Sequence, residues 1–365
     1  MTPKATNINI DPSNVRRILI CQLRQIGDVL LATPAIHLLR QHFPKAEIHL
    51  LTEKKTLPIV QGNPDIAHVH AIDKKAHRSL GAQFGFYLEV ARNRYDLVVD
   101  FQQLPRIRWV VALARLFRPE SGRQVRLSYE APWYNRWLYT HTVRPLDGYA
   151  AMAKASVLRP LGIEWNGESP RMHLDQAELA GAEAILREHA IGPGYLLVTV
   201  DPSHRRATRR WPAAHFGRLI ALAAAKNPRL KFLILYGPGE EPDAKAVAQA
   251  ADSPACIVTR RMLSLREMAG CIQLARLHLG NCSAPRHIAV AVGTPTLVIL
   301  GSTSGAWTFP GPGHTSLSLG LDCQPCNENA CPSGTIRCLT DLAPEAVLPE
   351  LMTHLAADGD PAPCA

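Results

Sequence analysis

The carboxylate of Asp28 follows the first buried-looking apolar run of the chain, residues 18–21. The run has the length of a parallel strand that is buried on both faces, and residues 29–39 have helical spacing of apolar side chains. In an open α/β sheet, ligands bind at the carboxyl end of such a strand. Gly27 permits a sharp turn, which places Asp28 at or beside the helix start. Two interpretations stay open: Asp28 caps the helix, or it is a catalytic base at the mouth of a cleft.

Four arginines lie within residues 205–210, between a predicted strand at 195–200 and a helix that begins near Pro212. Guanidinium groups at a helix entrance suit a phosphate or pyrophosphate by charge and by bidentate geometry. The plainer alternative is a solvated basic loop. Because Trp211 would anchor this loop, we favour the binding interpretation.

Two further stretches follow predicted strands. Residues 236–241 form a glycine-rich turn that ends in Glu240 and Glu241. A carboxylate there either accepts hydrogen bonds from sugar hydroxyls or favours the N-terminus of the next helix. In residues 279–289 a strand ends at Gly280 and a helix begins near Ser283, where backbone N–H groups can hold anionic oxygens.

These stretches belong to two series of alternating strands and helices. In the first half we expect strands at 18–21, 47–51, 67–72 and 95–101 and helices at 84–92, 107–116 and 149–161, with an irregular aromatic segment at 119–145. In the second half we expect strands at 195–200, 231–236, 255–259, 277–280 and 296–300 and helices at 213–225, 243–251, 265–271, 285–292 and 344–355. This alternation predicts an α/β protein with two doubly wound, Rossmann-like domains facing across a cleft.

The expected boundaries are a disordered N-terminus at 1–14, domains at 15–165 and 191–355, a linker with a short helix at 166–190, and a flexible C-terminus at 356–365. No G-x-G-x-x-G follows a predicted strand and no Walker A motif occurs, which argues against a dinucleotide enzyme or a P-loop kinase. The absence of a long apolar run and of a signal-peptide core predicts a cytoplasmic protein.

The chain of 365 residues carries a net charge of +9. Such a charge suits phosphorylated small molecules, nucleic acid or an acidic membrane surface. We expect no nucleic-acid partner, because no known nucleic-acid-binding module is recognisable. Seven cations in the first half would give that domain a basic face, although a solvated charged surface is the plainer account of most of them: Arg16, Arg17, Lys54, Lys55, Lys74, Lys75 and Arg78.

Nine cysteines occur, and four of them crowd near the end as Cys323, Cys326, Cys331 and Cys338. In a chain without a secretion signal, this count argues against a disulfide framework. Four thiols so close could bind structural zinc, although the spacing fits no standard finger. Reduced cysteines or a disulfide are the alternatives.

Five stretches together resemble the bacterial lipopolysaccharide heptosyltransferases. They are QLRQIGDVLLATPAIHLLRQHFP, ATRRWP, YGPGEE, GNCSAPRHIAVAVGTPTLVILGSTS and the tail CQPCNENACPSGTIRCLTDLAPEAV, which is most like the heptosyltransferase II branch. The resemblance covers about residues 17–355. It implies a GT-B type glycosyltransferase whose N-terminal domain receives the anionic lipid A–core acceptor and whose C-terminal domain binds ADP-heptose.

The resemblance also assigns roles to residues. Asp28 would be the general base of an inverting displacement, and no metal cofactor would be required. Acceptor contacts would come from Arg24, Gln25 and Gly27. The donor would contact Arg209, Arg210, Glu240, Glu241, Cys282, Ser283, Ala284 and His287. Peripheral contact with the cytoplasmic face of the inner membrane would follow from the acceptor.

Three positions depart from the family pattern. Cys282 stands where members usually carry Asp, Ala284 replaces a Gly, and Arg209 replaces a Lys. A thiol cannot substitute for a carboxylate as an acceptor of hydroxyl hydrogen bonds. Two alternatives therefore stay open: a related glycosyltransferase that uses another nucleotide sugar, and a non-catalytic homologue that binds nucleotide or glycolipid. His287 would lie near the diphosphate or pack in the core.

Overall fold

The computed structural model describes residues 8, 10–117, 119–120 and 122–356. The chain divides into two compact units, unit 1 up to His173 and unit 2 from Leu174. The two units are described separately. The expectations for residues 1–14 and 356–365 fall largely outside the described residues.

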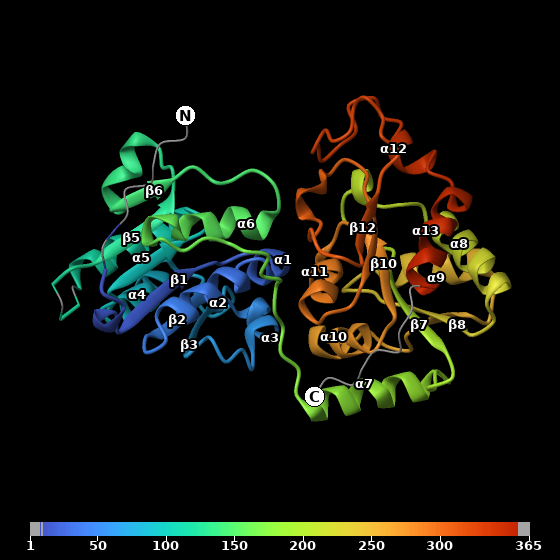
Figure 1. The fold of residues 1–365 in the computed structure, drawn as a ribbon, viewed down its shortest axis with the longest axis horizontal. Coiled ribbons are helices and arrows are strands. Elements are labelled where there is room, and N and C mark those ends of the chain that lie inside the picture. Colours follow the sequence, from blue (N-terminus) through green and yellow to red (C-terminus); the bar gives the residue numbers. More distant parts are fainter. Residues whose placement is uncertain (1–7, 9, 118, 121, 357–365) are drawn as a thin grey trace. The chain divides into compact units, whose positions relative to one another are not determined.

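Unit 1 is built on a six-stranded parallel sheet (Figure 1). Its strands are β1 (Arg17–Cys21), β2 (Glu47–Glu53), β3 (His68–Ile72), β4 (Leu97–Asp100), β5 (Val125–Tyr129) and β6 (His141–Val143). Their order is β3-β2-β1-β4-β5-β6, so the direction of winding reverses between β1 and β4. A ligand site of a doubly wound sheet lies at this switch point, outside the carboxyl ends of the strands.

The helices of unit 1 lie on both faces of this sheet. They are α1 (Ile26–Leu30), α2 (Thr33–His42), α3 (Leu57–Val60), α4 (Leu80–Ala91), α5 (Pro105–Leu116) and α6 (Ala150–Ala155), with 3-10 turns η1 (Pro12–Asn14), η2 (Lys54–Thr56), η3 (Trp133–Leu138) and η4 (Ser156–Leu161). One face is covered by α4, α5 and η3, whose inner side chains pack with Leu19 and Val98 in a single core cluster.

Three expectations for unit 1 were wrong. The single helix expected after residue 28 is two helices, because Pro34 lies in the first turn of α2 and the Thr33 hydroxyl donates to the Leu30 carbonyl oxygen (2.6 Å). The segment 119–145 is not irregular, since it contains β5, η3 and β6. Helix α4 begins four residues earlier than expected, where the Ser79 hydroxyl accepts a hydrogen bond from the Ala82 N–H.

Unit 2 repeats the topology of unit 1. Its strands are β7 (Leu196–Asp201), β8 (Leu230–Ile234), β9 (Cys256–Val258), β10 (Leu277–Asn281), β11 (Thr296–Ile299) and β12 (His314–Leu317), in the order β12-β11-β10-β7-β8-β9. The switch point lies between β7 and β10. Two six-stranded, doubly wound parallel sheets confirm the predicted fold class.

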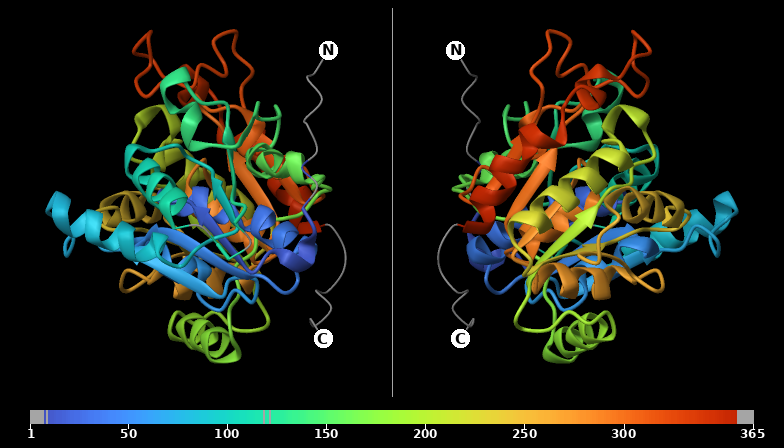
Figure 2. Two further views of the ribbon diagram at one scale, coloured as in Figure 1. Left: turned by 90° about the vertical axis from the view of Figure 1, so that its left-hand side faces the viewer. Right: turned by 90° about the vertical axis from the view of Figure 1, so that its right-hand side faces the viewer.

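The helices of unit 2 are α7 (Gln176–Glu188), α8 (Ala213–Lys226), α9 (Glu241–Ala251), α10 (Leu265–Gln273), α11 (Ala284–Ala291), α12 (Arg337–Thr340) and α13 (Pro344–Ala356), with 3-10 turns η5 (Ala207–Arg209) and η6 (Gly305–Trp307). Helices α8, α9 and α13 cover one face of the sheet, and α8 lies beside α13 (Figure 2). Strand β12 and helix α12 were not predicted. Helix α7, expected with the linker, packs on α10 within unit 2.

Within the described residues, no helix combines the length and apolarity needed to cross a membrane.

Candidate functional site

Asp28 lies at the switch point of unit 1, beyond the carboxyl end of β1. It is the third residue of α1, and its Oδ2 accepts a hydrogen bond from the N–H of Gln25, the N-cap residue (3.2 Å). The N-cap interpretation of Asp28 itself is therefore wrong by three residues, although the carboxylate still serves the helix start. Its side chain remains 30% exposed, so a substrate hydroxyl can reach it.

A buried lysine faces this carboxylate. The ammonium of Lys154, on α6, lies 3.6 Å from Oδ1 of Asp28 and donates to Oε1 of Gln22 (2.9 Å). Burial lowers the pKa of Lys154, and the negative charge of Asp28 opposes that shift. Lys154 therefore orients Asp28 and offsets its charge.

Residues 101–104, which follow β4, hold in place residues 22–25, which connect β1 to α1 and lead to Asp28. The buried Asp100 carboxylate accepts hydrogen bonds from the N–H groups of Gln102 (2.8 Å) and Gln103 (2.9 Å), and burial raises its pKa. Oε1 of Gln102 then accepts from the Leu23 N–H (2.9 Å). The backbone before α1 is thus fixed from the neighbouring strand.

The three residues expected to contact an acceptor adjoin Asp28. The Arg24 carbonyl accepts from the side chains of Gln22 and Gln102, and Gln25 accepts from Lys55 (3.1 Å). Gly27 lies inside α1 and has no positive φ, so the sharp turn expected there was wrong. Acceptor binding by Arg24, Gln25 and Gly27 stays a prediction.

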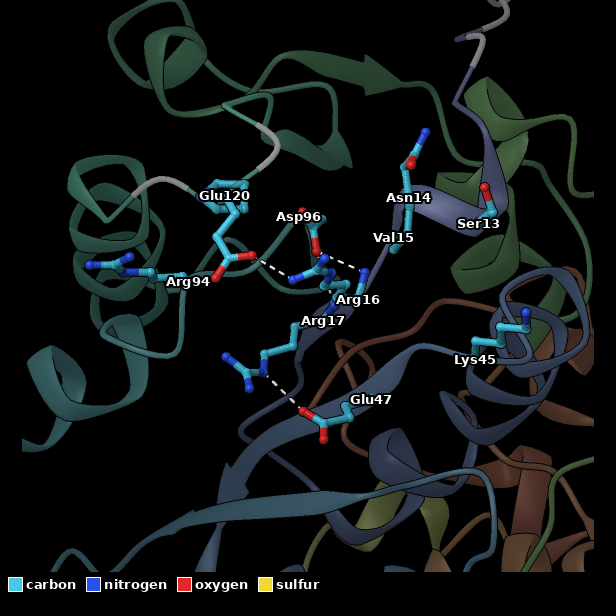
Figure 3. Close-up of a pocket in the computed structure, with 11 residues that line it drawn as sticks. Ser13, Asn14, Val15, Arg16, Arg17, Lys45, Glu47, Arg94, Asp96 and Glu120 are labelled. Carbon is cyan, nitrogen blue, oxygen red and sulfur yellow. Dashed lines mark hydrogen bonds and ion pairs between the residues drawn. The ribbon is translucent and has the colours of Figure 1, made fainter.

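The basic residues of unit 1 divide between two opposite edges of the sheet. Lys55 and Lys74 lie beyond the carboxyl ends of β2 and β3, 3.4 Å and 2.7 Å from the buried carboxylate of Glu53. Arg16 and Arg17 lie at the amino end of β1, where they border a cavity of about 660 Å³ with Glu47 and further charged residues (Figure 3). The single basic face expected from the sequence is therefore wrong.

In the described part of the chain, two of the four cations that border this cavity form ion pairs. Arg17 donates to Glu47 (2.9 Å), and Arg16 pairs with Glu120, as the dashed lines of Figure 3 mark. The Asp96 carboxylate accepts from the N–H groups of Arg16 and Arg17. Because the cavity lies at the amino edge of the sheet, it is separate from the switch point that holds Asp28.

In unit 2 the segment 204–212, which carries the four arginines and is called the arginine loop below, is held at the switch point by Asn281, the last residue of β10. Its buried amide accepts from the Trp211 N–H (2.9 Å) and donates to the Pro202 carbonyl (2.7 Å). Trp211 is fully buried and donates its indole N–H to the Leu342 carbonyl (3.0 Å). The sequence-based expectation that Trp211 anchors this loop is confirmed.

Two arginines are expected to bind the donor, and they differ in whether an acidic side chain neutralises their charge. The Nε of Arg209 is buried and has no hydrogen-bond partner among the described residues. Burial, reinforced by the charge of Arg206, lowers the pKa of Arg209. Arg210 instead pairs with Asp243 (3.2 Å). An anion is the natural partner for Arg209.

The three stretches at 204–212, 236–241 and 279–289 lie close together, since Asn281 binds the Trp211 N–H and both Ser283 and Glu240 act on Asp201. The Ser283 hydroxyl donates to the carboxylate of Asp201, the last residue of β7. Burial raises the pKa of Asp201 to about 7, an increase that the hydrogen bond from Ser283 opposes and the charge of Glu240 reinforces. Glu240 accepts from the Gly237 N–H (2.9 Å), whereas Glu241 pairs with Lys245 (2.7 Å).

The remaining donor candidates surround the start of α11. The thiol of Cys282 belongs to an apolar cluster with Val298 and Leu300 and accepts from the Arg286 guanidinium (3.2 Å). Ala284 is the first residue of α11, directly after the N-cap residue Ser283.

His287 is buried near Trp307, with 6.2 Å between the ring centroids. Its Nδ1 has no hydrogen-bond partner among the described residues, and burial holds its pKa well below the ordinary value. A buried neutral imidazole with one unused nitrogen fits either interpretation, so donor contact by His287 stays a prediction.

The cysteine tail folds next to the arginine loop, since the Thr208 hydroxyl donates to the Glu328 carbonyl (3.0 Å). A hydrogen bond from Ser333 and others from backbone N–H groups lower the pKa of Cys331 to about 7. Within the described part of the chain, no three histidine, cysteine or acidic side chains are placed to hold a metal ion. The tail thiols as arranged do not fit a zinc site, and zinc binding stays a prediction.

The comparisons with known proteins agree on one family. Residues 86–337 match glycosyltransferase family 9 (heptosyltransferase). The chain belongs to this family. Among curated relatives, lipopolysaccharide heptosyltransferase 3 of Escherichia coli is 31% identical over 296 residues, which cover 79% of this chain and 84% of that protein. The protein is therefore a glycosyltransferase, as predicted.

Solved structures of heptosyltransferases show the same fold. ADP-heptose LPS heptosyltransferase II of Escherichia coli has a TM-score of 0.73 at 16% identity, covering 93% of this chain and 98% of that one. Heptosyltransferase WaaC of Escherichia coli, solved with ADP-2-deoxy-2-fluoro heptose, has a TM-score of 0.67 at 17% identity, covering 93% and 100%. At these identities the likeness supports the fold alone.

Sequence reasoning missed four residues of this glycosyltransferase: Lys154, Asp100, Asp201 and Asn281. Asp100, Asp201 and Asn281 are the last residues of β4, β7 and β10. A polar residue that ends a buried apolar run was a usable signal for them. Lys154 follows the apolar stretch 150–153, and only its spatial position beside Asp28 distinguishes it from a surface lysine.

Proposed function

We propose that this glycosyltransferase transfers heptose from ADP-heptose to the anionic inner core of lipopolysaccharide, with inversion and without a metal cofactor. The proposal rests on Asp28, an accessible carboxylate held at the switch point of unit 1 by the Gln25 N–H and Lys154. The names of the relatives supply the sugar and the acceptor class, and the arginine loop supports a diphosphate donor.

In the proposed reaction, Asp28 accepts the proton of the acceptor hydroxyl, and that oxygen attacks the anomeric carbon of the donor sugar. The bond between this carbon and the diphosphate oxygen breaks, and ADP leaves with the electron pair. Arg209 would offset the negative charge of the departing diphosphate, as its unpartnered Nε suggests. Glu240 would accept hydrogen bonds from the ribose hydroxyls.

Asp201 is a specific reason to keep a different sugar as the alternative. Cys282 removes the family carboxylate, but Asp201 places a carboxyl group against Ser283, next to the same helix start. With a pKa of about 7, this group is partly protonated at neutral pH and can donate as well as accept a hydrogen bond. Such a group favours a hydroxyl pattern that differs from the one an ionised aspartate selects.

The acceptor is a membrane lipid, so the proposal includes peripheral contact with the cytoplasmic face of the inner membrane. Lys55 and Lys74, both paired with Glu53, would face the phosphate groups of the acceptor.

The test is acceptor-dependent release of ADP from ADP-heptose, with purified lipid A–core as acceptor. We expect turnover by the wild type and a loss of about 10²–10⁴-fold in Asp28→Asn, since the amide cannot accept the proton. Asp73→Asn is the matched control, because Asp73 is a surface carboxylate paired with Lys54 in the same unit.

A panel of other ADP- and UDP-sugars, run in parallel, tests the donor. Faster turnover of another sugar would favour the alternative donor. Binding of ADP-heptose without turnover, on every acceptor tried, would favour a non-catalytic homologue.

A further inference from the structure

The outer surfaces of α4, α5 and η3 carry a band of exposed apolar side chains that the proposed reaction does not use. We call it the aromatic face, and its members are Leu80, Phe84, Trp109, Leu116, Trp133 and Trp137. Leu80 is 85% exposed and Trp133 is 82% exposed. In the described part of unit 2, the large exposed apolar residues come from four separate loops and form no comparable band.

Of the three elements that carry the aromatic face, α5 contacts both α4 and η3. Phe84 of α4 meets Trp109 of α5 edge to face, with 6.1 Å between the ring centroids. The Arg115 guanidinium of α5 lies over the Trp137 ring of η3, 5.7 Å from its centroid. Figure 1 shows α4 and α5 beside one another, and their inner side chains belong to the core of unit 1. The face therefore lies on a rigid layer.

The sequence of α4 is unusual for a surface helix. Leu80–Ala91 contains one charged residue, Glu89, and apart from it the exposed positions are all apolar or glycine: Leu80, Gly81, Ala82, Phe84 and Gly85. A helix that is apolar on its solvent side needs another apolar or interfacial environment to cover it.

The charges on the same elements identify that environment. Helices α4 and α5 and the turn η3 carry four arginines against the single Glu89. Arg115 and Arg136 are exposed, whereas Arg106 lies 4.0 Å from the Glu53 carboxylate and Arg108 donates to the Gln103 carbonyl (3.1 Å). Tryptophans with flanking arginines suit the interface of an anionic bilayer, where the rings enter the headgroup layer and the guanidinium groups meet phosphates. A second copy of this chain, bound through the same face, would bring the arginines of the two copies together, which is unfavourable.

We infer that the aromatic face docks unit 1 on the surface of an anionic lipid bilayer. Docking would hold the enzyme next to a membrane-embedded acceptor. This role for docking rests on the proposed function. The binding itself follows from the surface alone and can be measured without any substrate.

The experiment is co-sedimentation of the full chain with vesicles of phosphatidylcholine alone or mixed with phosphatidylglycerol. We expect partitioning onto the mixed vesicles and a blue shift of tryptophan fluorescence, since Trp109, Trp133 and Trp137 are exposed whereas Trp211 is already buried. The triple variant Leu80→Gln/Trp109→Gln/Trp133→Gln should lose partitioning by about tenfold or more. Arg115→Gln/Arg136→Gln should weaken the preference for mixed vesicles by roughly fivefold per arginine.

Met262→Gln, an exposed apolar residue of unit 2, is the matched control and should bind as the wild type does. Thermal unfolding checks that each variant is folded. No partitioning by the wild type, equal partitioning by a folded triple variant, or dissolution of an oligomer by that variant would overturn the inference.

Transfer to a delipidated core oligosaccharide separates this inference from the proposed function. The triple variant should keep that activity while it loses activity on vesicle-embedded acceptor. If the wild type binds vesicles but transfers heptose to neither acceptor, the proposed function fails and the docking inference stands.

Discussion

Units 1 and 2 have the same strand order and the same switch-point device, but they carry opposite chemistry there. In each unit an amide side chain at the carboxyl end of the fourth strand holds the loop after the first strand. Gln102, two residues beyond β4, binds the Leu23 N–H, and Asn281, the last residue of β10, binds the Trp211 N–H. The loop of unit 1 presents the carboxylate Asp28, whereas that of unit 2 presents the cation Arg209. The fold therefore supplies the position, and the loop residues decide between proton transfer and anion binding.

The neighbours of the two charged groups differ as well. Asp28 has a buried cation beside it, because Lys154 lies 3.6 Å away. The buried Nε of Arg209 has no hydrogen-bond partner among the described residues, and the guanidinium forms no ion pair with a carboxylate of that part of the chain. Unit 1 is thus balanced without a ligand, whereas unit 2 has a cation that an anionic ligand would neutralise. Each prediction below alters one side of this comparison.

The largest effect is expected for Lys154→Met. Loss of the ammonium leaves Asp28 held only by the Gln25 N–H, so we expect kcat to fall by about 10–10³-fold with little change in ADP affinity. The control is Lys54→Met, which removes an exposed lysine of the same unit that pairs with Asp73. A Lys154→Met enzyme with wild-type kcat would show that the ion pair does not position the base.

A smaller effect is expected for Gly301→Ala in unit 2. A Cβ at residue 301 would overlap the Thr208 carbonyl oxygen, which accepts from the Ser302 N–H (2.9 Å), and would press on Leu339. We expect a loss of about 1–3 kcal/mol in the free energy of unfolding and weaker ADP binding, because the arginine loop must shift. Gly305→Ala has open space around its Cβ and should be neutral by denaturant titration.

The smallest effect concerns the pH dependence of unit 1. Burial, with the charges of His70 and His68, lowers the pKa of His49 to about 4. Between pH 6.5 and 4, His49 is protonated in the unfolded chain but stays neutral in the folded protein. The free energy of unfolding therefore falls as the pH falls. His49→Phe keeps the hydrogen bond between Tyr95 and His70 (3.2 Å). Between pH 7 and pH 5, its free energy of unfolding should fall by about 2 kcal/mol less than that of the wild type. Denaturant titrations at both pH values measure this, and equal losses would contradict it.

The alternation of apolar runs was sufficient to predict both sheets and most of their elements, since strands such as β1 and β11 contain the continuous apolar runs 18–21 and 297–299. It failed for β5, β6 and β12, which are short and contain polar or half-exposed residues. The positions of Asp28 and Arg209 followed from the rule that ligands bind at carboxyl ends of strands. Lys154 could not be predicted, because it lies 126 positions after Asp28 in the chain and only tertiary structure brings the two together.

Calorimetric titration of ADP into the wild type, Asp28→Asn and Arg209→Gln tests the division of roles between the units most directly. We predict that Asp28→Asn binds ADP as the wild type does and that Arg209→Gln binds at least about tenfold more weakly, the loss of one charge-assisted contact. Equal weakening in both variants, or wild-type affinity in Arg209→Gln, would contradict the account.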